Sequence, residues 1–303
     1  MTSGDPNRGQ ATATAGYRTA AGTDVIAHRG FAGVHPENTV AAVEASVADG
    51  RASMIEIDVM PTADGKIVVF HDDDLGRVTN APKSVAETKL WELPYERIAG
   101  YSVLGTDQSI PRLTDVLAAI PPEIGVNIEL KNPGCDELRF AEPLDDPALD
   151  EATDRWRAFV GRVLDTAADY EHELLFSSFY EGALAATREL DPSAAVATVC
   201  YDSVDTGLRL GRRYDVAAIH VPWNMVTEPP TGTATPVDEP IADGRLVDRA
   251  HAEGWRVNAW TVTTWHQAAT LRRAGVDGII ADYPGVVHPG TLDATAAAQP
   301  SDH

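Results

Sequence analysis

The chain has 303 residues, of which 44% are hydrophobic and 23% are charged, so it can bury a full core and is not disordered by composition. Asp and Glu number 46 against 24 Lys and Arg, and the net charge of -22 argues against nucleic acid and anionic membranes as partners. No apolar run approaches the roughly 18 residues of a membrane-spanning helix, and residues 1–23 lack the apolar stretch of a signal peptide. We expect a cytoplasmic protein with one domain at 24–290 and flexible tails at 1–23 and 291–303.

Arginine is much more common than lysine among the basic residues. Only 4 of the 24 are lysines, and the two cysteines, Cys135 and Cys200, are too few for a disulfide framework. An acidic, lysine-poor composition is typical of proteins from salt-loving microbes, in which salt screens the repulsion among carboxylates. A halophilic origin is therefore our expectation, with an ordinary acidic protein as the alternative.

The predicted elements begin with a strand and a helix. Asp24–His28 reads as a buried strand and Thr39–Ala48 as an amphipathic helix. Asn38 stands immediately before that helix, where an N-cap side chain accepts a hydrogen bond from a free backbone N–H. Met54–Val59 and Ile67–His71 are predicted as strands joined by a turn with an Asp-Gly pair, which is typical of a hairpin.

A long interruption follows the hairpin, and then strands and helices alternate. Residues 73–111 are too many for an ordinary loop and are predicted to form a small insertion, before a helix that begins near Leu113. Further strands are predicted at Gly125–Lys131, Leu174–Phe179, Ala194–Tyr201, Ala217–Val221, Arg256–Val262 and Gly278–Ala281, further helices at Ala152–Asp169, Glu181–Leu190, Val204–Arg213, Arg245–Glu253 and Trp265–Ala274, and a loop at Thr227–Pro240. About eight strand–helix units favour an α/β fold of the (β/α)8 TIM-barrel type, with the insertion after the second strand unit. The chain has no glycine-rich nucleotide-binding motif, which weakens the alternative of an open doubly wound sheet.

Polar side chains gather at the predicted strand ends, where a barrel carries its active residues. Glu56 and Asp58 are two apart on one strand, so both point to the same face and repel each other unless a proton or cation lies between them. With Glu129 they offer three hard oxygen ligands, which suit Mg²⁺ or Ca²⁺. The alternative is a solvated acidic strand end, but histidines on neighbouring strand ends favour the metal.

Two histidines and two cations complete this set. His28 and His71 titrate near neutrality, so one can accept a proton while the other donates one. Arg29 and Lys131 are either salt-bridge partners of the carboxylates or the groups that hold a phosphate anion. His220, which also ends a strand, is predicted to be a hydrogen-bonded core residue.

The motifs, taken in order, resemble the glycerophosphodiester phosphodiesterase family. They are His28-Arg29-Gly30, Pro36-Glu37-Asn38-Thr39, Glu56-Ile57-Asp58, His71-Asp72, Ile110-Pro111, Glu129-Leu130-Lys131 and Trp260-Thr261-Val262, and the resemblance runs from residue 24 to 283. It implies a TIM barrel, one divalent cation (Mg²⁺ or Ca²⁺) at the three carboxylates, and the two histidines as acid and base. It also implies phosphate contacts from Arg29 and Lys131, a glycerol pocket walled by Trp260, and supporting roles for Glu37, Asn38 and Asp72. Thr263 stands where the family often has Asn, a departure that affects substrate positioning.

The resemblance further implies a small-molecule substrate and a reaction. The expected reaction is metal-dependent hydrolysis of a glycerophosphodiester to glycerol phosphate and an alcohol, through a cyclic phosphate formed by attack of the neighbouring glycerol hydroxyl. One alternative is a lysophospholipase D-like enzyme on the same fold, which would need an apolar groove or patch. Another is a non-catalytic barrel that binds glycerol phosphates, which would be expected to lack one of the histidines or metal carboxylates.

Overall fold

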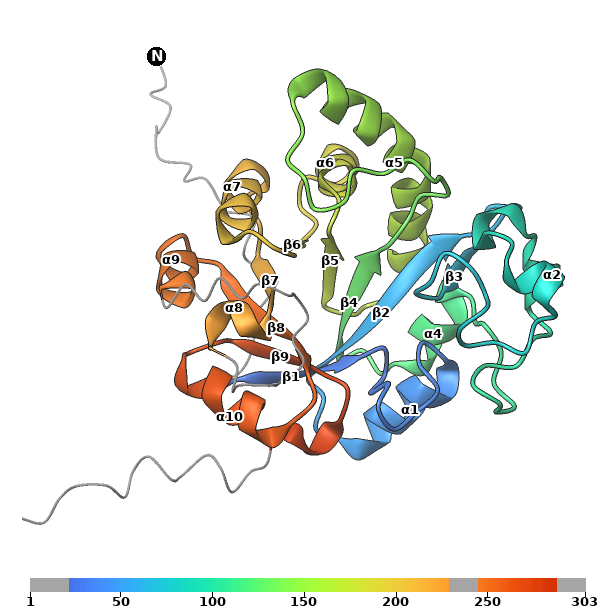
Figure 1. Cartoon of the computed structure of the whole chain (residues 1–303), viewed down its shortest axis with the longest axis horizontal. Coiled ribbons are helices and arrows are strands. Elements are labelled where there is room, and N and C mark those ends of the chain that lie inside the picture. The colour runs from blue at the N-terminus through green and yellow to red at the C-terminus, as the bar shows by residue number, and fades with distance from the viewer. Residues whose placement is uncertain (1–21, 229–244, 288–303) are drawn as a thin grey trace, which may run out of the picture.

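The computed structural model of the protein describes residues 22–228 and 245–287, and within them parallel strands close into a barrel (Figure 1). The barrel strands are β1 (Asp24–His28), β2 (Met54–Pro61), β4 (Gly125–Leu130), β5 (Leu174–Ser178), β6 (Val196–Val199), β7 (Ala218–Pro222), β8 (Arg256–Val262) and β9 (Gly278–Ala281). Their order is β1-β9-β8-β7-β6-β5-β4-β2, and the pairing of β1 with β2 closes the ring. The predicted (β/α)8 barrel is confirmed.

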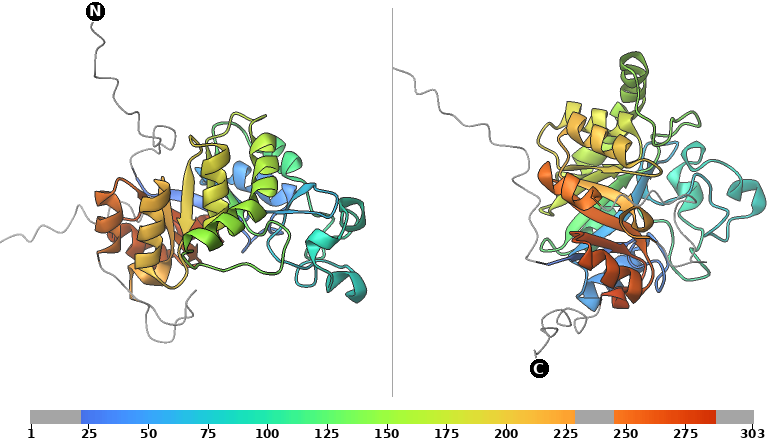
Figure 2. Two further views of the ribbon diagram at one scale, coloured as in Figure 1. Left: turned by 90° about the horizontal axis from the view of Figure 1, so that it is seen from above. Right: turned by 60° about the vertical axis from the view of Figure 1, so that its left-hand side comes forward.

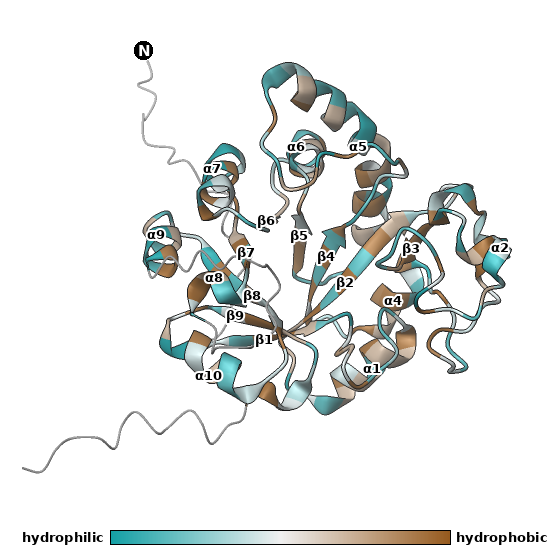
Figure 3. Ribbon diagram, in the orientation of Figure 1, coloured by the Kyte–Doolittle hydropathy of each residue, from teal (hydrophilic) through white to brown (hydrophobic). Residues whose placement is uncertain are grey.

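Helices surround this ring and cover its outer face (Figures 1 and 2). They are α1 (Val40–Asp49), α4 (Leu113–Ala119), α5 (Asp146–Ala167), α6 (Glu181–Leu190), α7 (Val204–Tyr214), α8 (Trp223–Val226), α9 (Leu246–Ala252) and α10 (Trp265–Arg273), followed by a 3₁₀ turn η2 (Pro284–Val286). In α5 the buried side chains Trp156, Phe159 and Val163 recur at helical spacing, so one stripe of the helix packs inward. Apolar residues accordingly face the strands, and polar residues cover much of the outer helix surface (Figure 3).

The inside of the barrel is apolar at one end and polar at the other. Ile26, Met54, Leu175 and Ile280 belong to a buried apolar cluster from the lower parts of the strands. Farther along the same strands, His28 and Glu56 point into the barrel, since residues two apart share a face. The apolar layer therefore closes the barrel floor and leaves polar side chains at the carboxyl ends of the strands.

The predicted insertion has a small core of its own. The strand β3 (Ile67–Val69) pairs antiparallel with the end of β2, and α2 (Lys83–Ala86), η1 (Leu90–Glu92) and α3 (Tyr95–Ile98) follow it. Met60 and Val68 on the outer side of this ribbon pack with Leu75, Leu90 and Ile98 in a separate buried cluster. The insertion stands beside the barrel next to β2 (Figure 2), so its first residues reach the barrel mouth.

Two sequence predictions about helix starts are wrong. Thr39, not Asn38, caps α1, because the Thr39 hydroxyl accepts from the backbone N–H of Ala42 and the Asn38 side chain turns to Asp58 instead. The helix predicted at Ala152–Asp169 begins six residues earlier, where Asp145 caps the first turn of α5. Asp and Pro are both common at helix starts, so the sequence held the signal for this second start.

All but the last two residues of the predicted tail at 1–23, the whole predicted tail at 291–303 and most of the predicted loop at Thr227–Pro240 lie outside the described residues. Within the part of the chain that the structure describes, no helix is both long enough and apolar enough to cross a membrane. Both cysteines are free thiols.

Candidate active site

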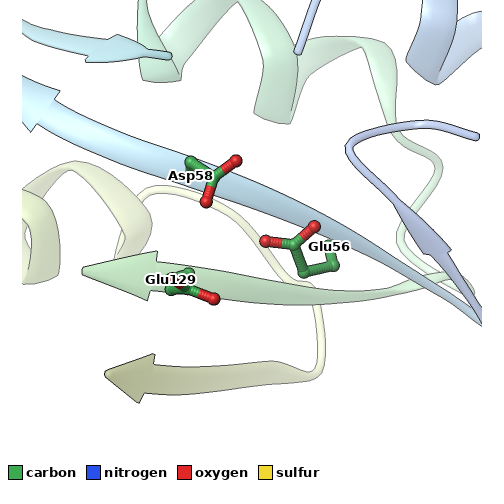
Figure 4. A group of neighbouring side chains, drawn as sticks. All are labelled: Glu56, Asp58 and Glu129. Carbon is green, nitrogen blue, oxygen red and sulfur yellow. The ribbon is translucent and has the colours of Figure 1, made fainter. Parts of the chain in front are cut away.

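Strand register assembles a carboxylate cluster at the barrel mouth. Parallel pairing sets His28 of β1 beside Glu56 of β2, and Asp58 of β2 beside Glu129 of β4. One carboxylate oxygen from each of Glu56, Asp58 and Glu129 lies within 4.8 Å of the others (Figure 4). Three hard oxygen donors this close together are a ligand set that fits a divalent cation such as Mg²⁺ or Ca²⁺.

Glu56 shows the electrostatic cost of this cluster. Its side chain is buried, and burial together with the nearby carboxylates of Asp58 and Glu129 raises its pKa well above the usual value. One of its oxygens accepts a hydrogen bond of 2.9 Å from the backbone N–H of Arg29, and the other, Oε1, is buried with no hydrogen-bond partner in the described residues. A buried carboxylate oxygen without a partner is unfavourable. The observation fits a ligand atom that faces a cation.

The pKa of Asp58 is shifted in the opposite direction to that of Glu56. Burial alone would raise its pKa, yet the cations around it, with His71 the strongest, keep the pKa well below its usual range. The Asn38 amide donates a 2.8 Å hydrogen bond to Asp58 Oδ2, and the Asp58 backbone N–H donates back to Asn38 Oδ1. This reciprocal pair fixes the orientation of the carboxylate.

The loop after β1 supplies a cation and needs an unusual backbone. Arg29, Gly30 and Asn38 all have positive φ, and a side chain at Gly30 would meet the Ala42 backbone at 2.9 Å. Glycine is thus required at position 30 by both its backbone angle and its close approach to α1. The left-handed turn directs the Arg29 N–H at Glu56, while its guanidinium lies 3.2 Å from Asp58 Oδ2.

Each of the two histidines predicted to act in catalysis, His28 and His71, is paired with an aspartate. Nδ1 of His28 lies 2.6 Å from Oδ1 of Asp282, which follows β9, and Nε2 of His28 lies 4.0 Å from Glu56. Nδ1 of His71 lies 2.6 Å from Oδ1 of Asp72. A carboxylate on Nδ1 fixes the ring orientation and leaves Nε2 to exchange protons in the pocket.

A chain of ion pairs joins the insertion to the barrel. The Arg77 guanidinium donates two hydrogen bonds to Asp72 and two to Glu37, and Arg29 donates a further 2.9 Å bond to Glu37. These bonds outweigh the effect of burial and lower the pKa of Glu37. Glu37 therefore stays ionised and bridges Arg29 to Arg77, and through Asp72 the chain reaches His71.

The cluster lines an inner pocket of about 100 Å³ in the barrel mouth. Lys131 lies 2.8 Å from Glu129 and 3.7 Å from Asp58, and although burial lowers its pKa, these carboxylates raise it above the usual value. Asn127 and Trp260 form other parts of the wall. His220, as expected, is buried and bonded to Asn258 at 3.0 Å, and burial with nearby Arg256 lowers its pKa to about 3.

The structure brings all the predicted site residues to this mouth. The two predicted histidines, the three carboxylates, Arg29, Lys131 and Trp260 border the inner pocket, and Glu37, Asn38 and Asp72 contact them. Sequence reasoning missed Asp282, Arg77 and Asn127. Asp282 follows a predicted strand directly and Asn127 shares a face with Glu129, so the strand-end rule and the two-residue period could have found both. Arg77 carries no such signal.

The closed barrel, with a carboxylate cluster and two histidine–aspartate pairs at the carboxyl ends of its strands, defines the class of a TIM-barrel hydrolase site. The model of the glycerophosphoryl diester phosphodiesterase family matches residues 28–286. The chain belongs to this family, whose members are phosphoric diester hydrolases, and the resemblance seen in the sequence is confirmed.

Known proteins of the family are similar to this chain over most of its length. A glycerophosphodiester phosphodiesterase of Bacillus altitudinis is 30% identical over 269 residues, which cover 86% of this chain and 95% of that protein. A solved structure of an Oleispira antarctica phosphodiesterase in complex with the product sn-glycerol-3-phosphate has a TM-score of 0.68 at 25% identity, covering 89% of this chain and 97% of that one. A lysophospholipase D of Rattus norvegicus, GDPD1, is 38% identical over 115 residues, 35% of each chain.

Proposed function

We propose that the protein hydrolyses glycerophosphodiesters to glycerol phosphate and an alcohol, with a divalent cation at Glu56, Asp58 and Glu129 and with His28 and His71 as the proton-transfer groups. The observation that most strongly supports this proposal is that the carboxylate cluster shares one pocket with two histidines, each hydrogen-bonded to its own aspartate. The phosphodiesterase and the product complex among the similar proteins support the substrate class.

The residues of the site account for the charge that the reaction must handle. A phosphodiester is an anion, and Arg29 and Lys131 border the pocket as cations that can face its oxygens. The cation, when bound, supplies Lewis-acid stabilisation of the phosphoryl oxygens. Since Arg29 and Lys131 both also contact Asp58, they are held in place before substrate binds.

The proton transfers follow from the two histidines. The glycerol hydroxyl next to the ester carbon attacks phosphorus, one histidine takes the hydroxyl proton, and the other donates a proton to the alcohol oxygen as the P–O bond breaks. The product is a cyclic phosphate, and water then opens it with the histidine roles reversed. An intramolecular attack of this kind is worth roughly 7–11 kcal/mol in favourable cases.

The test is release of glycerol phosphate, followed by ³¹P NMR, by the parent and by the His28→Ala and His71→Ala variants. Loss of either histidine should lower kcat by about 100-fold or more. A substrate whose attacking hydroxyl is methylated should bind and not react. Binding of glycerol phosphate with no turnover of any diester would show instead that the protein is a non-catalytic barrel. Hydrolysis of the methylated substrate as fast as that of the unmethylated one would exclude the cyclic intermediate.

A lysophospholipase D activity on the same fold is the second candidate. The segments that follow the neighbouring strands β1, β8 and β9 carry exposed apolar side chains, Val34 (55% exposed), Trp265 (63%) and Tyr283 (39%). The similar rat protein has this activity in its name. An exposed apolar group of this kind could meet an acyl chain. Preference for a lysophospholipid over its deacylated diester, lost in Trp265→Ser, would favour this function.

A further inference from the structure

Two cavities meet at the catalytic residues, and the inference drawn from them rests on the proposed function. The inner pocket of about 100 Å³ adjoins an outer pocket of about 360 Å³, and His71, Glu129, Lys131 and Phe179 border both. A phosphodiester has two alcohol halves joined at one phosphorus. With the phosphate at the shared border, each pocket receives one half.

The inner pocket has the chemistry of the glycerol half. Asn127 is fully buried, and neither its amide nitrogen nor its amide oxygen has a hydrogen-bond partner among the residues that the structure describes. The indole N–H of Trp260 also lacks a hydrogen-bond partner within this part of the chain. Buried donors and acceptors without partners are unfavourable unless a ligand or water meets them, and glycerol hydroxyls can do so. The outer pocket is left for the other alcohol.

One wall of the outer pocket is aromatic. Phe140 stacks on Phe179 with ring centroids 4.8 Å apart and meets Tyr180 edge-on at 5.7 Å. Phe140 remains 41% exposed although it lies among aromatic rings, so part of it is available to a ligand. At about 30 Å³ for each water molecule, the pocket has room for an alcohol of several heavy atoms.

Other residues of the outer pocket are acidic. Asp72, Asp73, Asp74 and Lys89 line only the outer of these two pockets, with a formal charge of -2 between them. Asp72 is bound to His71 and Arg77, and Asp73 lies 3.2 Å from Lys89. The Asp74 carboxylate accepts a 2.9 Å bond from the Gly76 backbone N–H and, within the described residues, forms no ion pair. The lining of the outer pocket therefore combines aromatic rings with a net negative charge.

We propose that the outer pocket binds the alcohol half of the substrate and selects alcohols that carry a positively charged amine, such as choline or ethanolamine. Aromatic faces attract organic cations, and quaternary ammonium groups are commonly bound by aromatic side chains. Asp74 adds a carboxylate whose charge no lysine or arginine in the described residues neutralises. An alcohol half with a net negative charge would meet the same carboxylates unfavourably.

The experiment compares two substrates of one shape. Glycerophosphocholine carries a trimethylammonium group, and glycerophospho-3,3-dimethylbutanol carries an uncharged tert-butyl group in its place. We expect the parent to cleave the choline ester with a kcat/KM about 10-fold higher. Asp74→Asn and Phe140→Leu should each reduce this ratio about 2- to 5-fold, because the first removes the charge while retaining the acceptor for Gly76, and the second removes the aromatic face. Asp107→Asn, an exposed position of the insertion outside the pocket, should leave the ratio unchanged.

The outcomes separate this inference from the function on which it rests. Cleavage of both esters at equal kcat/KM overturns the choice of a cationic alcohol and leaves the phosphodiesterase function standing. A preference for choline that neither Asp74→Asn nor Phe140→Leu lowers overturns the assignment to the outer pocket. Cleavage of neither ester overturns the choice of a cationic alcohol, and it overturns the phosphodiesterase function as well if no other glycerophosphodiester is cleaved.

Discussion

Replacement of Asp282 tests whether the aspartate on Nδ1 of His28 controls catalysis. The two side chains lie 2.6 Å apart although 254 positions separate them in the chain, because β1 and β9 are neighbours in the barrel. Asp282→Asn retains an acceptor for the ring N–H and loses the charge. Asp282→Ala loses both, so the His28 ring can rotate and its imidazolium form loses its counter-charge.

The expected loss follows from the kind of bond removed. A hydrogen bond to a charged group contributes about 1.5–3 kcal/mol, which corresponds to about 10- to 150-fold in rate. The Asp282 side chain is 24% exposed, and water screens part of its charge, so we expect Asp282→Ala to lower kcat by about 10- to 50-fold. Asp282→Asn should fall between this variant and the parent. KM should change less than kcat, since Asp282 is outside the pocket lining.

The assay is steady-state hydrolysis of a glycerophosphodiester across pH, with a matched control elsewhere in the chain. Asp277 lies 2.7 Å from His251 at the surface, in a third aspartate–histidine pair that is away from the barrel mouth. Asp277→Asn should leave kcat unchanged. A kcat of Asp282→Ala within twofold of the parent, or an equal loss in Asp277→Asn, would refute the reasoning.

Three further predictions concern binding and stability. Glu56→Gln should abolish tight binding of Mg²⁺ or Ca²⁺ in titration calorimetry while the circular dichroism spectrum is unchanged, and parent-like affinity would contradict the ligand set. The pKa of His220 is about 3 in the folded protein against about 6.5 when unfolded, so the unfolded chain binds an extra proton between these values and stability falls as pH drops through this window. Urea unfolding measures this: between pH 7 and pH 5 the free energy of unfolding of the parent should fall by about 2 kcal/mol more than that of His220→Gln, and equal decreases would refute the prediction. Finally, a net charge of -22 predicts a melting temperature that rises from low to molar KCl, less steeply in a variant with several exposed aspartates changed to Asn; an equal slope would exclude screening.

The fold could be predicted because its signals are local. Asp24–His28 and Arg256–Val262 are strands with the predicted bounds, since short β-branched runs between turn residues describe a buried strand. The start of α1 was misplaced by one residue because Asn38 and Thr39 are both good caps, and the choice between them depends on Asp58, 20 positions away. Local preference alone cannot decide between two such neighbours.

The site could be predicted where it follows the strand ends. Glu56, Asp58 and Glu129 come together because parallel strands carry their carboxyl ends to one edge, which the sequence pattern implies. Arg77 could not be found in this way, because its partners depend on how the insertion lies against the barrel. The outer pocket could not be predicted for the same reason, because its lining comes from the insertion and from the loops after β4 and β5.

The most direct test of the central claim is one experiment on one sample: cation is added back in steps to chelator-treated protein while bound cation and glycerol phosphate release are both measured. The account predicts no turnover at the start and activity that rises in proportion to bound cation up to one per chain, with neither binding nor activity in Asp58→Ala. Full turnover by the cation-free protein, or activity in Asp58→Ala equal to that of the parent, would contradict it.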